Sequence, residues 1–195
     1  MSKLLVLLIL FITGCQPQID NRASSGTTVV CFGDSLTAGY GSTAGNDYPS
    51  LLSKKISLPV INAGVTGDTT RDALLRLDHD VLAHDPKLVI ITLGANDFFQ
   101  GTPKKETLAN MTTIIERIKK QGSMVVWAEV KMGILGDPYI DDFTALADRE
   151  HIELIPDILS GIIDNPLFKY DQIHPNDIGY KMMAERIYQK IKGLI

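Results

Sequence analysis

The sequence has few cysteines, no glycine-rich nucleotide loop and no excess of positive charge. Two cysteines are too few for a disulfide framework. Neither a G-x-G-x-x-G nor a Walker-type loop occurs, and the histidines and cysteines lack zinc-site spacing, so we expect no cofactor and no metal. The formal net charge of −4 gives no sign of a nucleic-acid partner. The chain has 195 residues, and 45% of them are hydrophobic, which suffices for one compact domain.

The longest apolar run, residues 4–12, is too short to cross a bilayer, which takes roughly 20 apolar residues. Lys3 precedes it and small residues follow it, as in a secretory signal. Residues 12–15, Ile-Thr-Gly-Cys, resemble a bacterial lipobox, in which the cysteine becomes the first residue of the mature protein and carries lipid. We therefore predict a lipoprotein signal peptide over residues 1–14, lipidation of Cys15 and a place in the bacterial cell envelope. An ordinary secretory signal, with a periplasmic product, is the alternative.

Residues 15–26 are polar, with Pro, Asn, Ser and Gly, and predict a flexible tether before a domain over residues 27–195. Cys31 lies inside an apolar run, which favours a buried, inert thiol. A Cys15–Cys31 disulfide is the less favoured alternative, because it conflicts with lipidation of Cys15.

Short apolar segments alternate with amphipathic ones along the rest of the chain. The predicted strands, rich in β-branched residues, are 27–32, 58–63, 87–93, 123–130 and 151–155. The predicted helices are 47–56, 69–84, 104–121, 139–150 and 176–191. This alternation predicts a flavodoxin-like, three-layer α/β/α sandwich with about five parallel strands. Such sheets bind ligands at the carboxyl ends of their strands.

Polar residues and glycines follow the first three predicted strands. Ser35 follows the first strand in a Gly-Asp-Ser turn, beside a helix N-terminus that favours negative charge. Gly67 follows the second strand, and its backbone N–H can point at a ligand. Asn96 follows the third strand, and its amide can donate to a developing oxyanion. Taken singly, each also fits an ordinary turn, and we expect turn and capping roles for Asp34 and Asp97.

A histidine near the C-terminus adds a base. Residues 171–175 are Asp-Gln-Ile-His-Pro, and a carboxylate three residues before a histidine can fold back onto the ring. It would hold Nδ1–H and leave Nε2 to face a serine, whose hydroxyl is a poor nucleophile without such a base. The other histidines are expected to be surface or structural residues: His79, His84 and His151.

Together these blocks resemble the SGNH (GDSL-type) hydrolase family. The family's consensus blocks occur in order as GDSLTAGYG, GVTGDT, GAND and DQIHP, and the resemblance covers nearly all of residues 27–195. The last block departs from the common family form at Gln172, where the family has glycine. The departure leaves Asp171 and His174 in place, and its expected effect is on the shape of the loop. The resemblance implies these roles: nucleophile Ser35, base His174, orienting acid Asp171, and an oxyanion hole of Ser35 N–H, Gly67 N–H and the Asn96 side chain.

The resemblance implies a serine esterase that cleaves acyl esters or thioesters through an acyl-enzyme, similar to small bacterial arylesterases, thioesterases and lysophospholipases. Small acyl esters or lysophospholipid-like molecules are the expected substrates. Two alternatives stay open: a carbohydrate O-acetylesterase with the same triad, and a non-catalytic lipoprotein that binds a ligand. Apolar side chains in the predicted loops can either hold an acyl chain or pack as core: Phe98, Phe99, Met132, Ile134, Leu135, Tyr139, Leu167, Phe168 and Tyr170.

Overall fold

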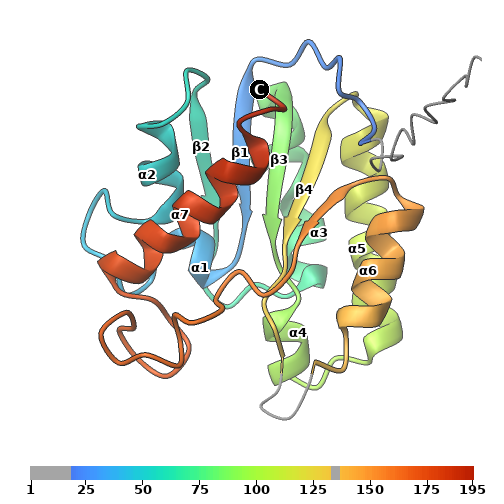
Figure 1. Ribbon diagram of the computed structural model, residues 1–195. Coiled ribbons are helices and arrows are strands. Elements are labelled where there is room, and N and C mark those ends of the chain that lie inside the picture. Colours follow the sequence, from blue (N-terminus) through green and yellow to red (C-terminus); the bar gives the residue numbers. More distant parts are fainter. Residues whose placement is uncertain (1–18, 133–136) are drawn as a thin grey trace, which may run out of the picture.

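The computed structural model describes residues 19–132 and 137–195, and within them the predicted three-layer sandwich is confirmed (Figure 1). The predicted signal peptide, Cys15, Ile134 and Leu135 lie outside the described residues. One parallel sheet contains β1 (Thr28–Gly33), β2 (Val60–Gly64), β3 (Pro86–Thr92), β4 (Met124–Ala128) and β5 (Glu153–Ile155). The strand order is β2-β1-β3-β4-β5, the flavodoxin-like order.

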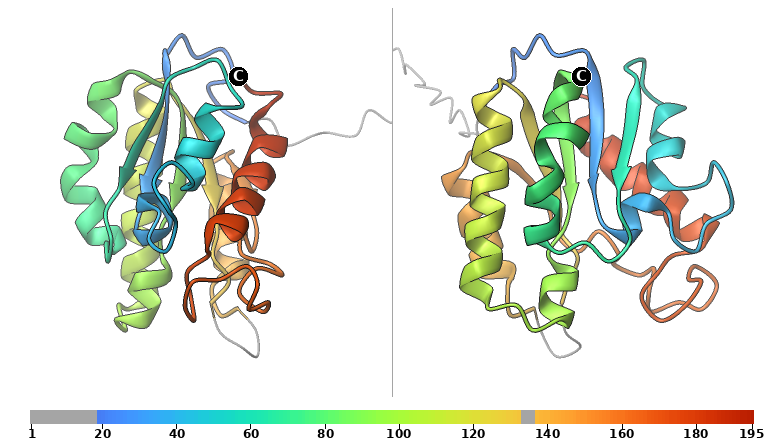
Figure 2. Two further views of the ribbon diagram at one scale, coloured as in Figure 1. Left: turned by 90° about the vertical axis from the view of Figure 1, so that its left-hand side faces the viewer. Right: turned by 180° about the vertical axis from the view of Figure 1, so that it is seen from behind.

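The strands are continuously apolar because both faces of the sheet are covered. Val30 and Phe32 of β1 point into one core, and Val29 and Cys31 point into the other. Cys31 is fully buried, and this burial raises the pKa of its thiol well above the ordinary value. Figure 2 shows the helices on both faces. The first core is covered by α3 (Thr70–Asp80), α5 (Lys104–Lys120) and α6 (Ile140–Arg149), and the second by α2 (Tyr48–Ser53) and α7 (Asp177–Ile191).

Two helices end several residues earlier than predicted: the helix predicted over 47–56 ends at Ser53, and the one predicted over 69–84 ends at Asp80. Thr69 caps α3 in a capping box with Asp72, but the helix ends at Asp80, since Val81 leaves helical geometry at φ −126°. A 3₁₀ turn, η1 (Leu82–His84), replaces the last predicted turn. None of the helices in the described parts of the chain is long and apolar enough to span a membrane.

Two short helices, which the sequence pattern did not predict, lie just beyond the carboxyl ends of β1 and β3 (Figure 1). They are α1 (Ser35–Ala38) and α4 (Ala95–Phe99). Four or five residues are too few to establish an apolar period of 3.6. Both helices begin at the edge of the sheet where ligands bind in this architecture.

The described part of the predicted tether is packed against the domain. Ile19 is buried, and the Asn21 side chain donates to the carbonyls of Lys119, at 2.8 Å, and Ser123, at 3.0 Å. Ser123 directly precedes β4, so these contacts lie at the amino ends of the strands. The chain therefore joins the domain at the edge of the sheet opposite α1 and α4 (Figure 1).

Candidate active site

The three residues predicted as a triad are brought together by the fold. The Ser35 hydroxyl lies 2.9 Å from His174 Nε2, although the two residues are 139 positions apart in the chain. On the other side of the ring, Nδ1 lies 2.8 Å from Asp171 Oδ2 and 3.0 Å from Oδ1. Asp171 Oδ1 also accepts the main-chain N–H groups of Ile173 and His174, each at 2.9 Å, which closes the turn that contains Gln172. This is the arrangement in which a histidine can accept a serine proton.

Ser35 is the first residue of α1 and follows β1 after a single intervening residue. That residue, Asp34, caps the helix, and its side chain accepts the Leu36 N–H at 3.0 Å. The first N–H groups of a helix have no partner inside the helix. The Ser35 N–H therefore lies at a helix N-terminus, where a negative oxygen is favoured.

The loop that carries His174 is fixed on both sides. Lys169 and Pro175 form an antiparallel bridge, and the Tyr170 N–H donates to the His174 carbonyl at 2.8 Å. The Tyr40 ring packs against the imidazole, with 4.7 Å between ring centroids. These contacts hold the imidazole in position beside Ser35.

Asn96 enters the site from α4. Its Nδ2 donates to the main-chain oxygen of Asp68 at 2.9 Å and lies 3.4 Å from Asp34 Oδ2. The shorter bond fixes the plane of the amide. The second N–H makes only the long contact to Asp34, so a substrate oxygen can replace that contact.

Gly67 lies in the turn that separates β2 from α3. The Asp68 N–H closes this turn on the Val65 carbonyl at 3.2 Å, and Gly67 has φ +89°. A Cβ at Gly67 would meet nothing within 4 Å, so backbone conformation, and not space, requires glycine here. Ser35 and Asn96 line the cavity described below, whereas Gly67 does not.

The carboxylates beside these residues have the expected capping roles. Asp97 is fully buried and accepts the N–H of Thr70, the first residue of α3, at 2.8 Å. Asp34, the N-cap residue of α1, is also buried. Burial, helped by the negative charges of Asp68 and Asp97, raises the pKa of Asp34 to about 7, against the lowering effect of the Leu36 N–H.

Asp34→Asn should therefore change how stability depends on pH. From pH 4 upward the unfolded chain ionises Asp34, whereas the folded chain keeps the proton until about pH 7. The stabilising contribution of Asp34 is thus complete below pH 4 and is lost as the pH rises to 7. Asparagine caps equally well and does not titrate. We expect the free energy of unfolding of the variant, relative to wild type, to rise by about 4 kcal/mol between pH 4 and 7 and to stay constant above.

Urea unfolding at pH 4, 5.5, 7 and 8.5 measures this difference, with exposed Asp148→Asn as the control that should show no such trend. A constant difference for Asp34→Asn over the whole range would show that burial does not hold the proton on this carboxyl.

A cavity of about 1130 Å³ opens beside Ser35 and His174. Phe98 and Phe99 line it, and the Phe99 side chain is 60% exposed. Other apolar side chains in its wall are Leu36, Leu159, Ile163 and Ile173. Of the apolar residues in the predicted loops, Phe98 and Phe99 therefore line the cavity, whereas others pack as core or lie elsewhere on the surface. Met132 and Tyr139 are core residues, Phe168 packs against the second core, and Leu167 and Tyr170 are exposed outside the cavity.

Sequence reasoning missed two residues of this region, Tyr40 and Arg76. Tyr40 lies inside the first motif block and gave no separate signal. Arg76 had a signal: it lies three residues after Ala73 and beside Leu77, both fully buried, so it is a charged residue on the apolar side of α3. In the described parts of the chain, no group of three His, Cys, Asp or Glu residues could hold a metal ion.

A Ser-His-Asp arrangement at the carboxyl edge of a flavodoxin-like sheet defines the class of α/β serine hydrolases. The sequence profile of the GDSL-like lipase/acylhydrolase family matches residues 31–182, and the chain belongs to this family. The family membership predicted from the four motif blocks is thereby confirmed. The chain is an enzyme of a family of esterases and acylhydrolases.

Known relatives cover nearly the whole chain. An arylesterase of Vibrio mimicus is 31% identical over 202 residues, or 98% of each protein. Thioesterase 1/protease 1/lysophospholipase L1 of Escherichia coli K12 is 28% identical over 182 residues, which cover 89% of this chain and 88% of the relative. Among solved structures, the esterase EstA from Pseudoalteromonas sp., inhibited by monoethylphosphonate, matches with a TM-score of 0.77 and 26% identity, covering 86% of this chain and 97% of that one.

Proposed function

We propose that this protein is a serine esterase that hydrolyses acyl esters or thioesters through an acyl-enzyme formed on Ser35. The observation that carries the proposal is the continuous hydrogen-bond chain from Ser35 through His174 to Asp171. The apolar cavity beside it and the names of the arylesterase and lysophospholipase relatives support acyl chains as the group bound.

In this mechanism His174 takes the Ser35 proton as the hydroxyl attacks the ester carbonyl. The oxyanion accepts hydrogen bonds from Ser35 N–H, Gly67 N–H and the Asn96 side chain. Each such donor contributes about 2.7–4 kcal/mol of transition-state stabilisation. His174 then protonates the leaving alcohol or thiol, and water repeats the sequence to release the acid.

Hydrolysis of p-nitrophenyl esters from C2 to C12 tests the substrate class. We expect kcat/KM to rise from C2 to medium chains, because a longer acyl chain covers more of the cavity wall. Phe99→Ala should lower kcat/KM about tenfold for the C8 ester and leave the C2 ester nearly unchanged, since the lost contact lies along the chain. Leu75→Ala is the matched control, as Leu75 is 84% exposed and lies outside the cavity.

A sharp preference for the acetyl ester would instead favour a carbohydrate O-acetylesterase with the same triad. Absence of hydrolysis of every ester, together with no labelling of Ser35 by a fluorophosphonate, would favour the non-catalytic lipoprotein.

We also propose that residues 1–14 are removed and that Cys15 carries a lipid anchor in the bacterial envelope. The lipobox-like residues 12–15 support this. Ile19 is packed on the domain, and only three residues of the sequence separate it from Cys15. Ile19 packs near the amino ends of the strands, at the end of the sheet opposite α1 and α4 (Figure 1). Because residues of α1 and α4 line the cavity, the cavity would face away from the anchoring membrane. Metabolic labelling with palmitate tests the anchor: label that persists in Cys15→Ala would overturn it.

A further inference from the structure

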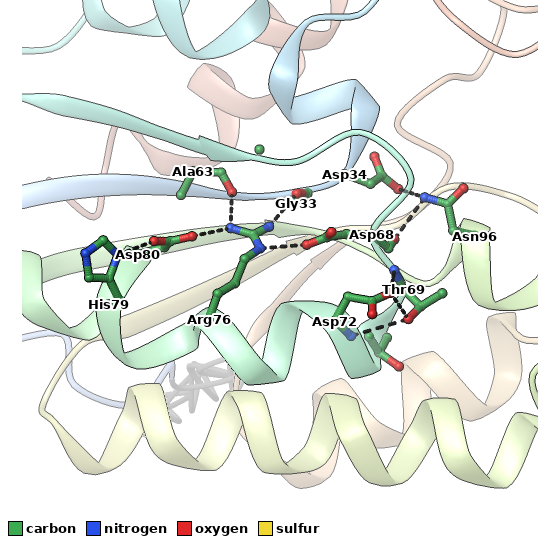
Figure 3. Close-up of polar contacts among 12 residues, drawn as sticks. Gly33, Asp34, Ala63, Asp68, Thr69, Asp72, Arg76, His79, Asp80 and Asn96 are labelled. Atoms are coloured by element: carbon green, nitrogen blue, oxygen red, sulfur yellow. Dashed lines mark hydrogen bonds and ion pairs between the residues drawn. The ribbon is translucent and has the colours of Figure 1, made fainter.

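One arginine side chain, Arg76 of α3, makes hydrogen bonds to Gly33, Ala63 and Asp68, as Figure 3 shows. Its Nη2 donates to the Gly33 carbonyl and its Nη1 to the Ala63 carbonyl, each at 2.9 Å, while Nε donates to the Asp68 carboxylate at 2.6 Å. The Arg76 side chain is only 16% exposed, and the guanidinium carbon lies 4.6 Å from the centroid of the Phe32 ring. These contacts leave the guanidinium little freedom to move.

Each acceptor borders one of the proposed oxyanion donors. Gly33 is the last residue of β1 and lies two positions before Ser35. Ala63 lies in β2, which leads into the turn with Gly67, and Asp68 directly follows that glycine. The guanidinium thus connects the two segments whose backbone N–H groups would face the oxyanion.

The third donor is tied to the same network through the backbone. Asn96 Nδ2 donates to the main-chain oxygen of Asp68 at 2.9 Å, and the Asp68 carboxylate is held by Arg76 (Figure 3). The position in which Arg76 holds Asp68 therefore sets the direction of the second N–H of Asn96.

We infer, on the basis of the proposed esterase function, that Arg76 is a positioning residue for the oxyanion hole and acts mainly through Asp68 on Asn96. Arginine suits this place because its donors project from a rigid plane in several directions. A lysine ammonium is a single point and cannot reach acceptors in three segments. Asp80, at 3.0 Å from Nη1, supplies a second negative charge that helps to balance the largely buried guanidinium.

Steady-state kinetics of Arg76→Lys on a p-nitrophenyl ester tests the inference. We expect kcat to fall about 10- to 100-fold while KM stays within about twofold, because misplaced donors weaken transition-state binding more than ground-state binding. Arg71→Lys is the control: Arg71 lies on the same helix, is exposed and pairs with Glu106 at the surface. It should keep the wild-type kcat.

A double-mutant cycle with Asn96→Ala separates positioning from a merely structural role. If Arg76 acts through Asn96, Arg76→Lys should lower kcat only a few-fold once the amide is gone. An equal loss in both backgrounds overturns the inference, as does a wild-type kcat in Arg76→Lys.

Asp68→Ala serves as a second variant if Arg76→Lys does not fold, as judged by circular dichroism. It removes the carboxylate but keeps the carbonyl that accepts from Asn96, and it should lower kcat at least fivefold with the same dependence on Asn96. An unchanged kcat in folded Asp68→Ala overturns the inference. Failure of the proposed function looks different, because wild-type protein would then show no activity that Ser35→Ala removes.

Discussion

Replacing Ser35 by alanine is expected to lower kcat for p-nitrophenyl esters about 10⁶-fold, the scale known for removal of a serine nucleophile from a complete triad. The variant keeps the cavity and the oxyanion donors but has no oxygen 2.9 Å from His174 Nε2 to attack the carbonyl. A small residual rate over water should persist, because oxyanion stabilisation and binding remain. KM should change little, since the hydroxyl adds little to ground-state binding.

Initial rates of the purified variant, next to Ser53→Ala, measure this effect. Ser53 carries an exposed hydroxyl at the end of α2, and its variant should match wild type. A fluorophosphonate should label wild type and Ser53→Ala at Ser35 and leave Ser35→Ala unlabelled. Ser35→Ala with more than a small fraction of wild-type activity would show that another group is the nucleophile.

Asp171→Asn is expected to lower kcat about 10⁴-fold, the loss seen when a triad aspartate becomes asparagine without a change of geometry. The carboxylate accepts the proton of His174 Nδ1, which leaves Nε2 without a proton and able to act as base. Partial burial opposes ionisation of Asp171, but hydrogen bonds from the Ile173 and His174 N–H groups and the imidazole prevail and lower its pKa. An asparagine amide can donate to Nδ1 instead, which places the proton on Nε2.

The measurement is kcat between pH 6 and 9, where the low pKa keeps Asp171 ionised in wild type. Asp177→Asn is the control. Asp177 is the first residue of α7, accepts hydrogen bonds from the Thr43 N–H and hydroxyl, and does not contact the triad. A circular dichroism spectrum confirms folding. A loss smaller than about tenfold at every pH would mean that Asp171 does not set the protonation of His174.

The sequence by itself determined where the strands lie. β1 and β3 are covered by helices on both faces, so burial acts on every residue and leaves an unbroken apolar run that is visible without a structure. The four motif blocks were equally visible, because each follows a strand end or precedes the last helix. The residues that contact one another in the Ser35–His174–Asp171 chain could all be named in advance for this reason.

The tertiary structure decided how these blocks meet. The sheet order places β1 between β2 and β3, so the segments of Gly67 and Asn96 flank Ser35 on its two sides. Periodicity along a chain reports which face of an element is buried, and it does not report which strand lies beside which. It also could not show that Ile19 packs against the domain, because a polar segment with a single large apolar residue has no period.

Electrostatics at the site also depended on the tertiary structure. The raised pKa of Asp34 comes first from its burial and then from the charges of Asp68 and Asp97, which belong to other segments. The partners of Arg76 lie between 4 and 43 residues away in the chain. Local sequence determined which residue types were available and how each element folds, whereas solvent exclusion and the distances between charges arise only when the sheet and its helices pack together.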